Sequence, residues 1–143
     1  MGTRSVNDYV LEDQIGHLLR RAHQRATGIF QSEIGDAQVT PTQFAALVKL
    51  AEDGEVSQNR LGRLTAMDPA TIQGVVRRLA GRGLVEQRAD PDDRRRTLLR
   101  LTLEGRTLVD GLLPNGPRVS AVTLEPLDEG EQATLLRLLR RLT

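Results

Sequence analysis

The chain has 143 residues, carries a formal net charge of +1 and contains no cysteine, which excludes disulfides, thiolate catalysis, iron–sulfur clusters and cysteine-based peroxide sensing. Only 2% of the residues are aromatic, so we expect a core of Leu, Val, Ile and Ala, a composition that favours helices over sheets. No apolar run approaches membrane-spanning length and no signal peptide is visible, which predicts one soluble cytoplasmic domain, residues 1–143.

Residues 1–7 are expected to form a disordered lead, and a long amphipathic helix is predicted over residues 8–33. Its apolar residues recur at steps of three and four, and they are Leu11, Ile15, Leu18, Ala22, Ala26, Ile29 and Phe30. A stripe of this length favours packing against a partner subunit, with packing inside one chain as the alternative. His17 and His23 are six residues apart and lie off a common helical face. We therefore expect no metal site, and no other cofactor.

Three helix starts follow, each marked by a capping residue. Thr40-Pro41-Thr42-Gln43 is a capping box, and it predicts a helix with an inward stripe of Phe44, Leu47, Val48 and Ala51 that ends at Gly54. Ser57 opens a short helix with Leu61 and Leu64 inward, and Asp68-Pro69 opens another that Gly83 stops. Two short helices joined by the tight turn 65–67 indicate a helix-turn-helix.

The second of these two helices has two different faces. Its apolar face is predicted to hold Ile72, Val75, Val76 and Leu79, and its opposite face holds Ala70, Gln73, Gly74 and Arg77, flanked by Thr71 and Arg78. Small residues let a helix approach a groove floor closely, Gln pairs with adenine, and Arg pairs with guanine or a phosphate. This face therefore favours contact with duplex DNA, and an ordinary solvated helix face is the alternative.

Two short strands, residues 84–88 and 97–101, flank a turn built from Asp, Pro and Arg and predict a β-hairpin. Arg94, Arg95 and Arg96 stand at its tip and suit the negative potential of a narrow minor groove. Asp92 and Asp93 would be costly near phosphates, so we expect them to pair within the loop and to fix its shape. A self-neutralised surface loop is the alternative.

The C-terminal part is predicted to be helical. Thr102 caps a helix that contains Leu108, Val109, Leu112 and Leu113, and Pro114-Asn115-Gly116-Pro117 should interrupt it. Residues 118–126 are ambiguous. Asp128-Glu129-Gly130-Glu131 resembles a capping box, and the helix that follows carries Leu135, Leu138, Leu139 and Leu142. The predicted fold is mainly α with a small β-hairpin wing, a winged helix-turn-helix in a helical frame.

Three motifs at fixed spacing resemble the MarR family of transcriptional regulators. They are Arg82-Gly83-Leu84-Val85, Asp90-Pro91-Asp92-Asp93-Arg94-Arg95 and Leu101-Thr102-Leu103-Glu104-Gly105. The resemblance implies a homodimer with dimerisation helices at 8–34 and 103–143, and a DNA-binding winged region at 40–102. It implies a helix in the major groove, Arg94 or Arg95 in the minor groove, Asp93 paired with an arginine, and a palindromic operator. Residues 18–25 and 57–68 are similar to members that control aromatic-acid breakdown.

The resemblance also implies repression relieved by a small aromatic acid or phenol. An apolar slot with a cationic anchor would hold such a ligand, and Arg20, His23, Phe30 and Phe44 are the predicted pocket residues.

Ser57, Gln58 and Asn59 join the predicted DNA contacts. A winged-helix protein–protein interaction module without DNA binding is the alternative function. An enzyme is not expected, because no catalytic constellation is present in the sequence.

Overall fold

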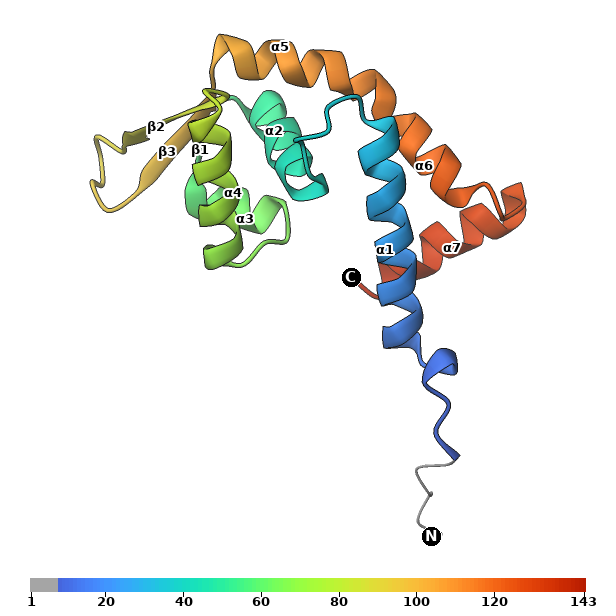
Figure 1. Cartoon of the computed structure of the whole chain (residues 1–143). Helices are drawn as coiled ribbons and strands as arrows, with labels where there is room; N and C mark the ends of the chain where they lie inside the picture. Colours follow the sequence, from blue (N-terminus) through green and yellow to red (C-terminus); the bar gives the residue numbers. More distant parts are fainter. Residues whose placement is uncertain (1–7) are drawn as a thin grey trace, which may run out of the picture.

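The computed structural model describes residues 8–143, so the predicted disordered lead at residues 1–7 lies outside it. The elements in chain order are η2 (Leu11–Asp13), α1 (Ile15–Glu33), α2 (Pro41–Asp53), β1 (Val56–Ser57), α3 (Gln58–Leu64), α4 (Pro69–Gly81), β2 (Val85–Ala89), β3 (Thr97–Leu101), α5 (Leu103–Leu112), η3 (Leu113–Asn115), α6 (Gly116–Leu124) and α7 (Glu129–Arg141). A winged part made of α2–α5 and the sheet lies beside a helical frame made of α1, α6 and α7 (Figure 1). The predicted fold class is confirmed.

The helix starts follow the predicted caps. Thr40 Oγ1 accepts from the Gln43 backbone N–H at 3.3 Å, and Gln43 Oε1 accepts from the Thr40 N–H at 3.4 Å, which completes the capping box of α2. Ser57, Asp68, Thr102 and Asp128 cap α3, α4, α5 and α7 in turn. Each cap satisfies a backbone donor that has no partner inside its helix, so each fixes where a helix begins.

The Thr40 cap gives a simple stability test. Thr40→Ala leaves a first-turn N–H of α2 without its side-chain acceptor, so it should lower the free energy of unfolding by about 1 kcal/mol. Urea denaturation at fixed protein concentration measures the change. Arg77→Ala, at an exposed position within α4, is the control and should change stability by less than about 0.5 kcal/mol. Equal losses in the two variants would contradict the capping role.

The main core lies between α2, α3, α4, α5 and the inner face of the sheet. Its fully buried side chains include Leu47, Leu50, Leu61, Ile72, Leu79, Leu99 and Val109. The predicted inward stripe of α2 was partly wrong: Ala46, Leu47 and Leu50 are buried, while Phe44, Val48 and Ala51 are half-buried. Val48 and Ala51 still pack against the main core and Phe44 against a second one, because α2 contacts α3, α4, α5 and β3.

Two predicted boundaries need correction, and one strand was not predicted. The first helix begins at Ile15 rather than at residue 8, because Gln14 is extended and its side-chain amide donates to the Val10 carbonyl at 2.9 Å. Strand β2 begins one residue later than predicted, since Leu84 instead donates its N–H to the Leu79 carbonyl at the end of α4. β1 was not predicted; it joins β3 on the side opposite β2, giving the order β1-β3-β2.

The frame meets the winged part at a small second core. Phe30, Ile34, Val39 and Leu112 are buried there, and the ring of Phe44 lies 5.6 Å from that of Phe30 at an interplanar angle of 60°. This geometry is a favourable tilted aromatic contact. The joint therefore has its own apolar packing, which adjoins the main core through Leu108.

The predicted interruption at residues 114–117 is confirmed. A 3₁₀ turn, η3, separates α5 from α6, and the ambiguous residues 118–126 fall largely within α6. Asn115 Nδ2 donates to the Ile34 carbonyl at 2.8 Å, and Arg118 Nε lies 2.7 Å from Glu33 Oε2. These contacts hold α6 against the end of α1.

Candidate nucleic-acid interface

The two faces of α4 are arranged as predicted. Ile72, Val75, Val76 and Leu79 are buried against the core, whereas the opposite side leaves Ala70, Thr71, Gln73, Arg77 and Arg78 exposed and Gly74 half-buried. The surface around Gly74 is open. A Cβ built there would make only an ordinary van der Waals contact, at 3.9 Å from Arg78 Nη1. The guanidinium of Arg78 thus reaches from the flank of this face toward Gly74.

The N-terminus of α4 carries an acid whose oxygens are both occupied. Asp68 Oδ1 accepts from the Thr71 N–H at 2.8 Å, and the Thr71 hydroxyl donates to Asp68 Oδ2 at 3.0 Å. The Thr71 backbone N–H, followed by its hydroxyl, lowers the pKa of Asp68. Asp68 therefore stays ionised at neutral pH and orients Thr71, whose oxygen keeps a lone pair for another donor.

The helices of the helix-turn-helix cross closely at Gly62. A Cβ at this position would lie 3.1 Å from the Met67 carbonyl oxygen and 3.3 Å from Ile72 Cγ2. The turn between α3 and α4 also contains Ala66 at φ 54°, in the left-handed region. A tight crossing of this kind sets the angle at which α4 projects from the domain.

The wing loop is organised around Asp90, which sequence reasoning missed. Asp90 is buried; its Oδ1 accepts from the Asp92 N–H at 2.9 Å, and its own N–H donates to the Arg96 carbonyl at 2.9 Å. Arg96 Nε lies 3.9 Å from Asp90 Oδ2. An Asp at the first position of such a turn is a recognised signal, because its carboxylate accepts from the backbone two residues on.

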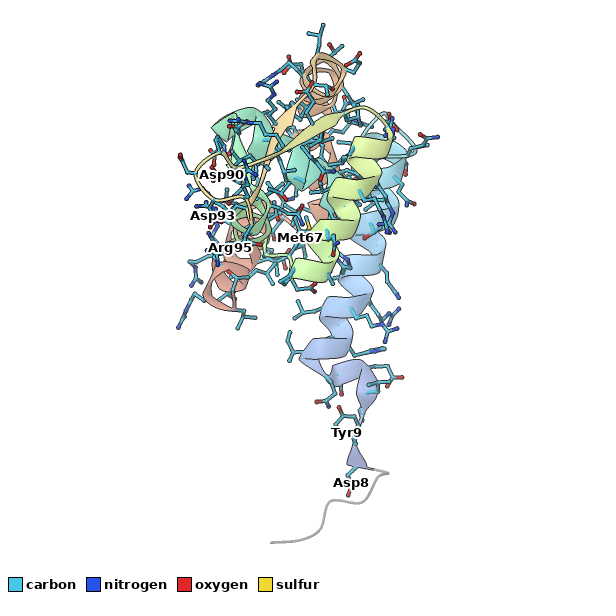
Figure 2. All side chains as sticks on the ribbon, turned by 90° about the vertical axis from the view of Figure 1, so that its left-hand side faces the viewer. Asp8, Tyr9, Met67, Asp90, Asp93 and Arg95 are labelled. Atoms are coloured by element: carbon cyan, nitrogen blue, oxygen red, sulfur yellow. The ribbon has the colours of Figure 1, made fainter. Side chains whose placement is uncertain are left out.

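Of the two aspartates predicted to stabilise the wing, Asp93 pairs as expected. Its carboxylate accepts from the Arg95 backbone N–H at 3.1 Å and lies 3.2 Å from Arg95 Nε, and these bonds lower the pKa of Asp93. Asp92 differs, because the contact that the structure gives it is through its backbone N–H rather than its carboxylate. Figure 2 shows the loop with Asp90, Asp93 and Arg95 seen from its tip.

The three tip arginines differ in their surroundings. The Arg95 side chain is 90% exposed although it is held by Asp93, and Arg96 is anchored toward Asp90. Among residues 8–143, Arg94 has no ion-pair partner. The acids therefore neutralise part of the loop, in line with the alternative of a self-neutralised loop, but they leave guanidinium groups projecting into solvent.

The wing and the helix-turn-helix share a small polar cleft. Its volume is about 120 Å³, and its lining residues are Ser57, Gln58, Asn59, Arg95, Arg96 and Thr97. The cleft brings the predicted contacts at the start of α3 together with two of the wing arginines. Its size and polarity suit a phosphate oxygen or ordered water.

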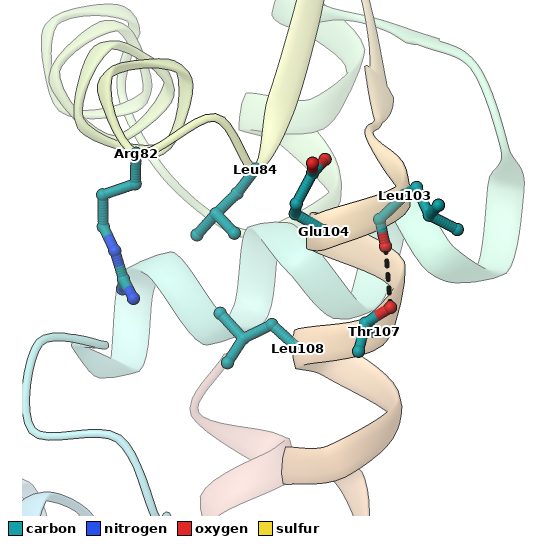
Figure 3. Close-up of a pocket in the computed structure, with 6 residues that line it drawn as sticks. All are labelled: Arg82, Leu84, Leu103, Glu104, Thr107 and Leu108. Atoms are coloured by element: carbon teal, nitrogen blue, oxygen red, sulfur yellow. Dashed lines mark hydrogen bonds between the residues drawn. The ribbon is translucent and has the colours of Figure 1, made fainter.

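The four predicted ligand residues do not form one closed site in the single chain. Phe30 and Phe44 contact each other in the joint core, whereas Arg20 and His23 are exposed on α1, nearer its N-terminal end. A different, open depression of about 440 Å³ lies where α4, β2 and α5 meet, lined by Arg82, Leu84, Leu103, Glu104, Thr107 and Leu108 (Figure 3). Arg82 is paired there with Asp36 at 3.1 Å.

A membrane-spanning role gains no support from the helices. None of those between residues 8 and 143 combines the length and the apolar character needed to cross a bilayer.

Comparisons with known proteins agree with this geometry. The model of the MarR family matches residues 37–96. The HTH-type transcriptional repressor NicR of Pseudomonas putida is 42% identical over 94% of this chain and 85% of its own length. A crystal structure of a probable transcriptional regulator from Pseudomonas aeruginosa is 51% identical, with a TM-score of 0.88 over 94% of this chain and 100% of that one.

A third relative is a regulator with a known small-molecule effector. It is BpsR of Bordetella bronchiseptica, whose DNA binding is regulated by 6-hydroxynicotinic acid. It is 40% identical to this chain, with a TM-score of 0.86 over 94% of this chain and 96% of its own. All three likenesses extend over both the winged part and the frame.

Proposed function

The chain belongs to the MarR family, and from this premise we propose that it is a dimeric, sequence-specific DNA-binding repressor released by a small aromatic acid or phenol. The observation that carries the proposal is the exposed face of α4 beside an arginine-tipped wing, with a polar cleft between that wing and α3. Its relatives are transcriptional regulators rather than enzymes, and NicR is named as a repressor. A repressor of this kind acts where its operator DNA lies, in the cytoplasm.

In this proposal α4 enters the major groove of the operator. Gln73 can pair with adenine and Arg77 with guanine or a phosphate, while Ala70 and Gly74 let the helix approach the base edges. Thr71 and Arg78 flank this face and reach the nearest phosphates. Sequence is thus read by a short row of side chains on one helix.

The remaining contacts hold the backbone of the duplex. Ser57, Gln58 and Asn59 line the polar cleft with Arg95 and Arg96, so one phosphate can be held between α3 and the wing. Arg94 and Arg95 project from the tip, where a narrow minor groove would attract them. These contacts supply affinity and register.

A second copy of the chain would cover apolar side chains that a single copy exposes. Tyr9, Val10, Leu11, Ile15, Leu18 and Leu19 are exposed at the N-terminal end, and Leu135, Leu136, Leu138 and Leu142 are exposed on or just after α7. Large clusters of this kind are unusual on a monomer surface. We assign residues 8–34 and 103–143 to dimerisation and residues 40–102 to DNA binding, which implies a palindromic operator.

The effector is proposed to act at the joint between frame and winged part. Phe30 and Phe44 offer aromatic surface there, and Arg20 and His23 stand on the same helix as Phe30, where they could hold a carboxylate. An aromatic acid regulates DNA binding by BpsR, which supports this ligand class. A ligand that prefers the spacing unfit for the operator would release the protein by population shift.

Selection from a random pool of duplexes tests the function directly. We expect the protein to enrich a palindrome, and hydroxylated aromatic acids, 6-hydroxynicotinic acid among them, to dissociate the selected duplex in a mobility-shift assay. Aliphatic acids of equal charge are the control for salt effects. Failure to enrich any palindrome would favour the alternative, a protein–protein interaction module without DNA binding.

A further inference from the structure

A charged strap lies across the outer face of the sheet, away from the core. We define the strap as Glu55, Glu86, Arg88 and Arg100, which are all exposed. Arg88 Nε donates to Glu55 Oε2 at 2.9 Å, and Arg88 Nη2 donates to Glu55 Oε1 at 2.7 Å. Arg100 Nε donates to Glu86 Oε2 at 2.8 Å. The first pair is bidentate, so its geometry is more restrictive than that of a single contact.

The two pairs connect different strands. Glu86 lies opposite Arg100 in the ladder between β2 and β3, so their side chains join strands that backbone hydrogen bonds already hold together. Glu55 directly precedes β1, whereas Arg88 is in β2, and β3 lies between these two strands. The Glu55–Arg88 pair therefore crosses over β3 and ties together two strands that share no ladder.

This connection links the wing with the helix-turn-helix, and through it with α4. β1 is only two residues long, and Ser57, its last residue, is also the N-cap of α3, with Ser57 Oγ accepting from the Arg60 N–H at 3.2 Å. Any contact that fixes β2 relative to β1 thus fixes the hairpin relative to α3, which packs on α4. The ladder between β1 and β3 holds only the pairs Val56–Leu99 and Ser57–Leu98, so the side-chain pair adds a second tie between the hairpin and β1. Sheets twist and bend readily, and a second tie restricts that movement.

We propose that Glu55 and Arg88 are positioning residues for DNA binding: their pair sets the angle between the wing and the helix-turn-helix, so that wing tip and α4 meet one duplex together. This inference rests on the proposed function. Neither side chain needs to touch DNA. Bonding to Arg88 lowers the pKa of Glu55, so the pair is fully ionised at neutral pH.

Glu55→Gln is the decisive variant, because the two possible roles of Arg88 predict opposite changes in DNA affinity. If Arg88 merely contacted a phosphate, removing the neighbouring acid would strengthen DNA binding. If the pair positions the wing, the same change weakens binding about threefold to fivefold although the protein becomes more positive. The charge swap Glu55→Arg with Arg88→Glu should restore affinity to within about twofold of wild type. Affinity is measured on a random-sequence duplex pool and on the selected palindrome.

A distance measurement tests the geometry without DNA. Because the chain has no cysteine, spin labels can be placed through Asp92→Cys in the wing loop and Gly81→Cys at the end of α4. The distance distribution should broaden or shift in Glu55→Gln and return in the charge swap. Glu86→Gln is the matched control, and it should leave both the distribution and the affinity unchanged.

The outcomes separate the two proposals. An unchanged distance distribution in Glu55→Gln, or stronger DNA binding by that variant, overturns the positioning role. Wild-type protein that binds no duplex overturns the proposed function, while the distance distributions still decide whether the pair sets the wing angle. Equal effects in Glu55→Gln and Glu86→Gln would show a general loss of sheet stability and would also overturn the positioning role.

Discussion

Replacing Gly105 with alanine should lower the free energy of unfolding by about 3 kcal/mol, a large loss for a single methyl group. A Cβ at this buried position in the first turn of α5 would overlap the carbonyl oxygen of Leu84 and press against Leu101. Because the obstacle on the Leu84 side is backbone, it cannot rotate away. The same carbonyl accepts from the Thr102 N–H at 3.0 Å, so displacing it also disturbs the bond that joins the N-cap of α5 to the residue before β2.

Gly111→Ala is the control on the same helix. Gly111 is exposed, and a Cβ there would meet nothing within 4 Å, so the change should stabilise the protein by up to about 1 kcal/mol through helix propensity. Urea unfolding at one fixed concentration compares the variants, since the stability of a dimer depends on concentration. Equal midpoints for Gly105→Ala and wild type would contradict the close approach of α5 to Leu84.

Arg95→Ala should weaken operator binding about thirtyfold or more, because a dimer loses the contact at both wings. The slope of log affinity against log salt should become shallower by about two, one phosphate contact for each wing. The structure favours Arg95 over Arg94 for the larger effect, since Asp93 orders the Arg95 side chain before binding while leaving it 90% exposed. Ordering a side chain in advance reduces the entropy lost on association.

Two further variants sharpen this test. Asp93→Ala should also weaken binding, although it removes a negative charge near DNA, because Arg95 loses its support. Arg137 is exposed on α7, a helix that lies away from the wing (Figure 1), so Arg137→Gln should leave the salt slope unchanged. Affinities measured by fluorescence anisotropy at several salt concentrations are required. If Arg95→Ala and wild type bind equally at each concentration, the wing does not contact DNA.

The parts of the fold that could be predicted from sequence were those governed by local chemistry. The caps at Thr40, Asp68 and Asp128 depend on a side chain and a backbone N–H three residues apart, so the sequence contains the whole interaction. The two faces of α4 followed from helical periodicity alone. These signals need no knowledge of the neighbouring elements.

The parts that could not be predicted depend on contacts between distant residues. β1 is too short for a periodic pattern, and it becomes a strand only because Val56 and Ser57 lie opposite Leu99 and Leu98. The Glu55–Arg88 pair could not be predicted either, because its two residues are 33 positions apart in the sequence. Asp90 is different, because its contact is local: an Asp at the start of a turn accepts from the backbone N–H two residues on, here that of Asp92.

The contact of Asn115 with Ile34 has a geometric consequence for movement. Within residues 8–143 the chain passes between frame and winged part twice, once after α1 and once through η3. The two crossings touch, since Asn115 Nδ2 bonds to the Ile34 carbonyl and a Cβ on Gly35 would lie 3.0 Å from that nitrogen. Two adjacent crossings form a hinge. The winged part can rotate about this hinge relative to the frame, whereas translation between the two parts is restricted. A small rotation at this hinge becomes a larger displacement at the wing tip, which lies away from the hinge at the far side of the winged part (Figure 1).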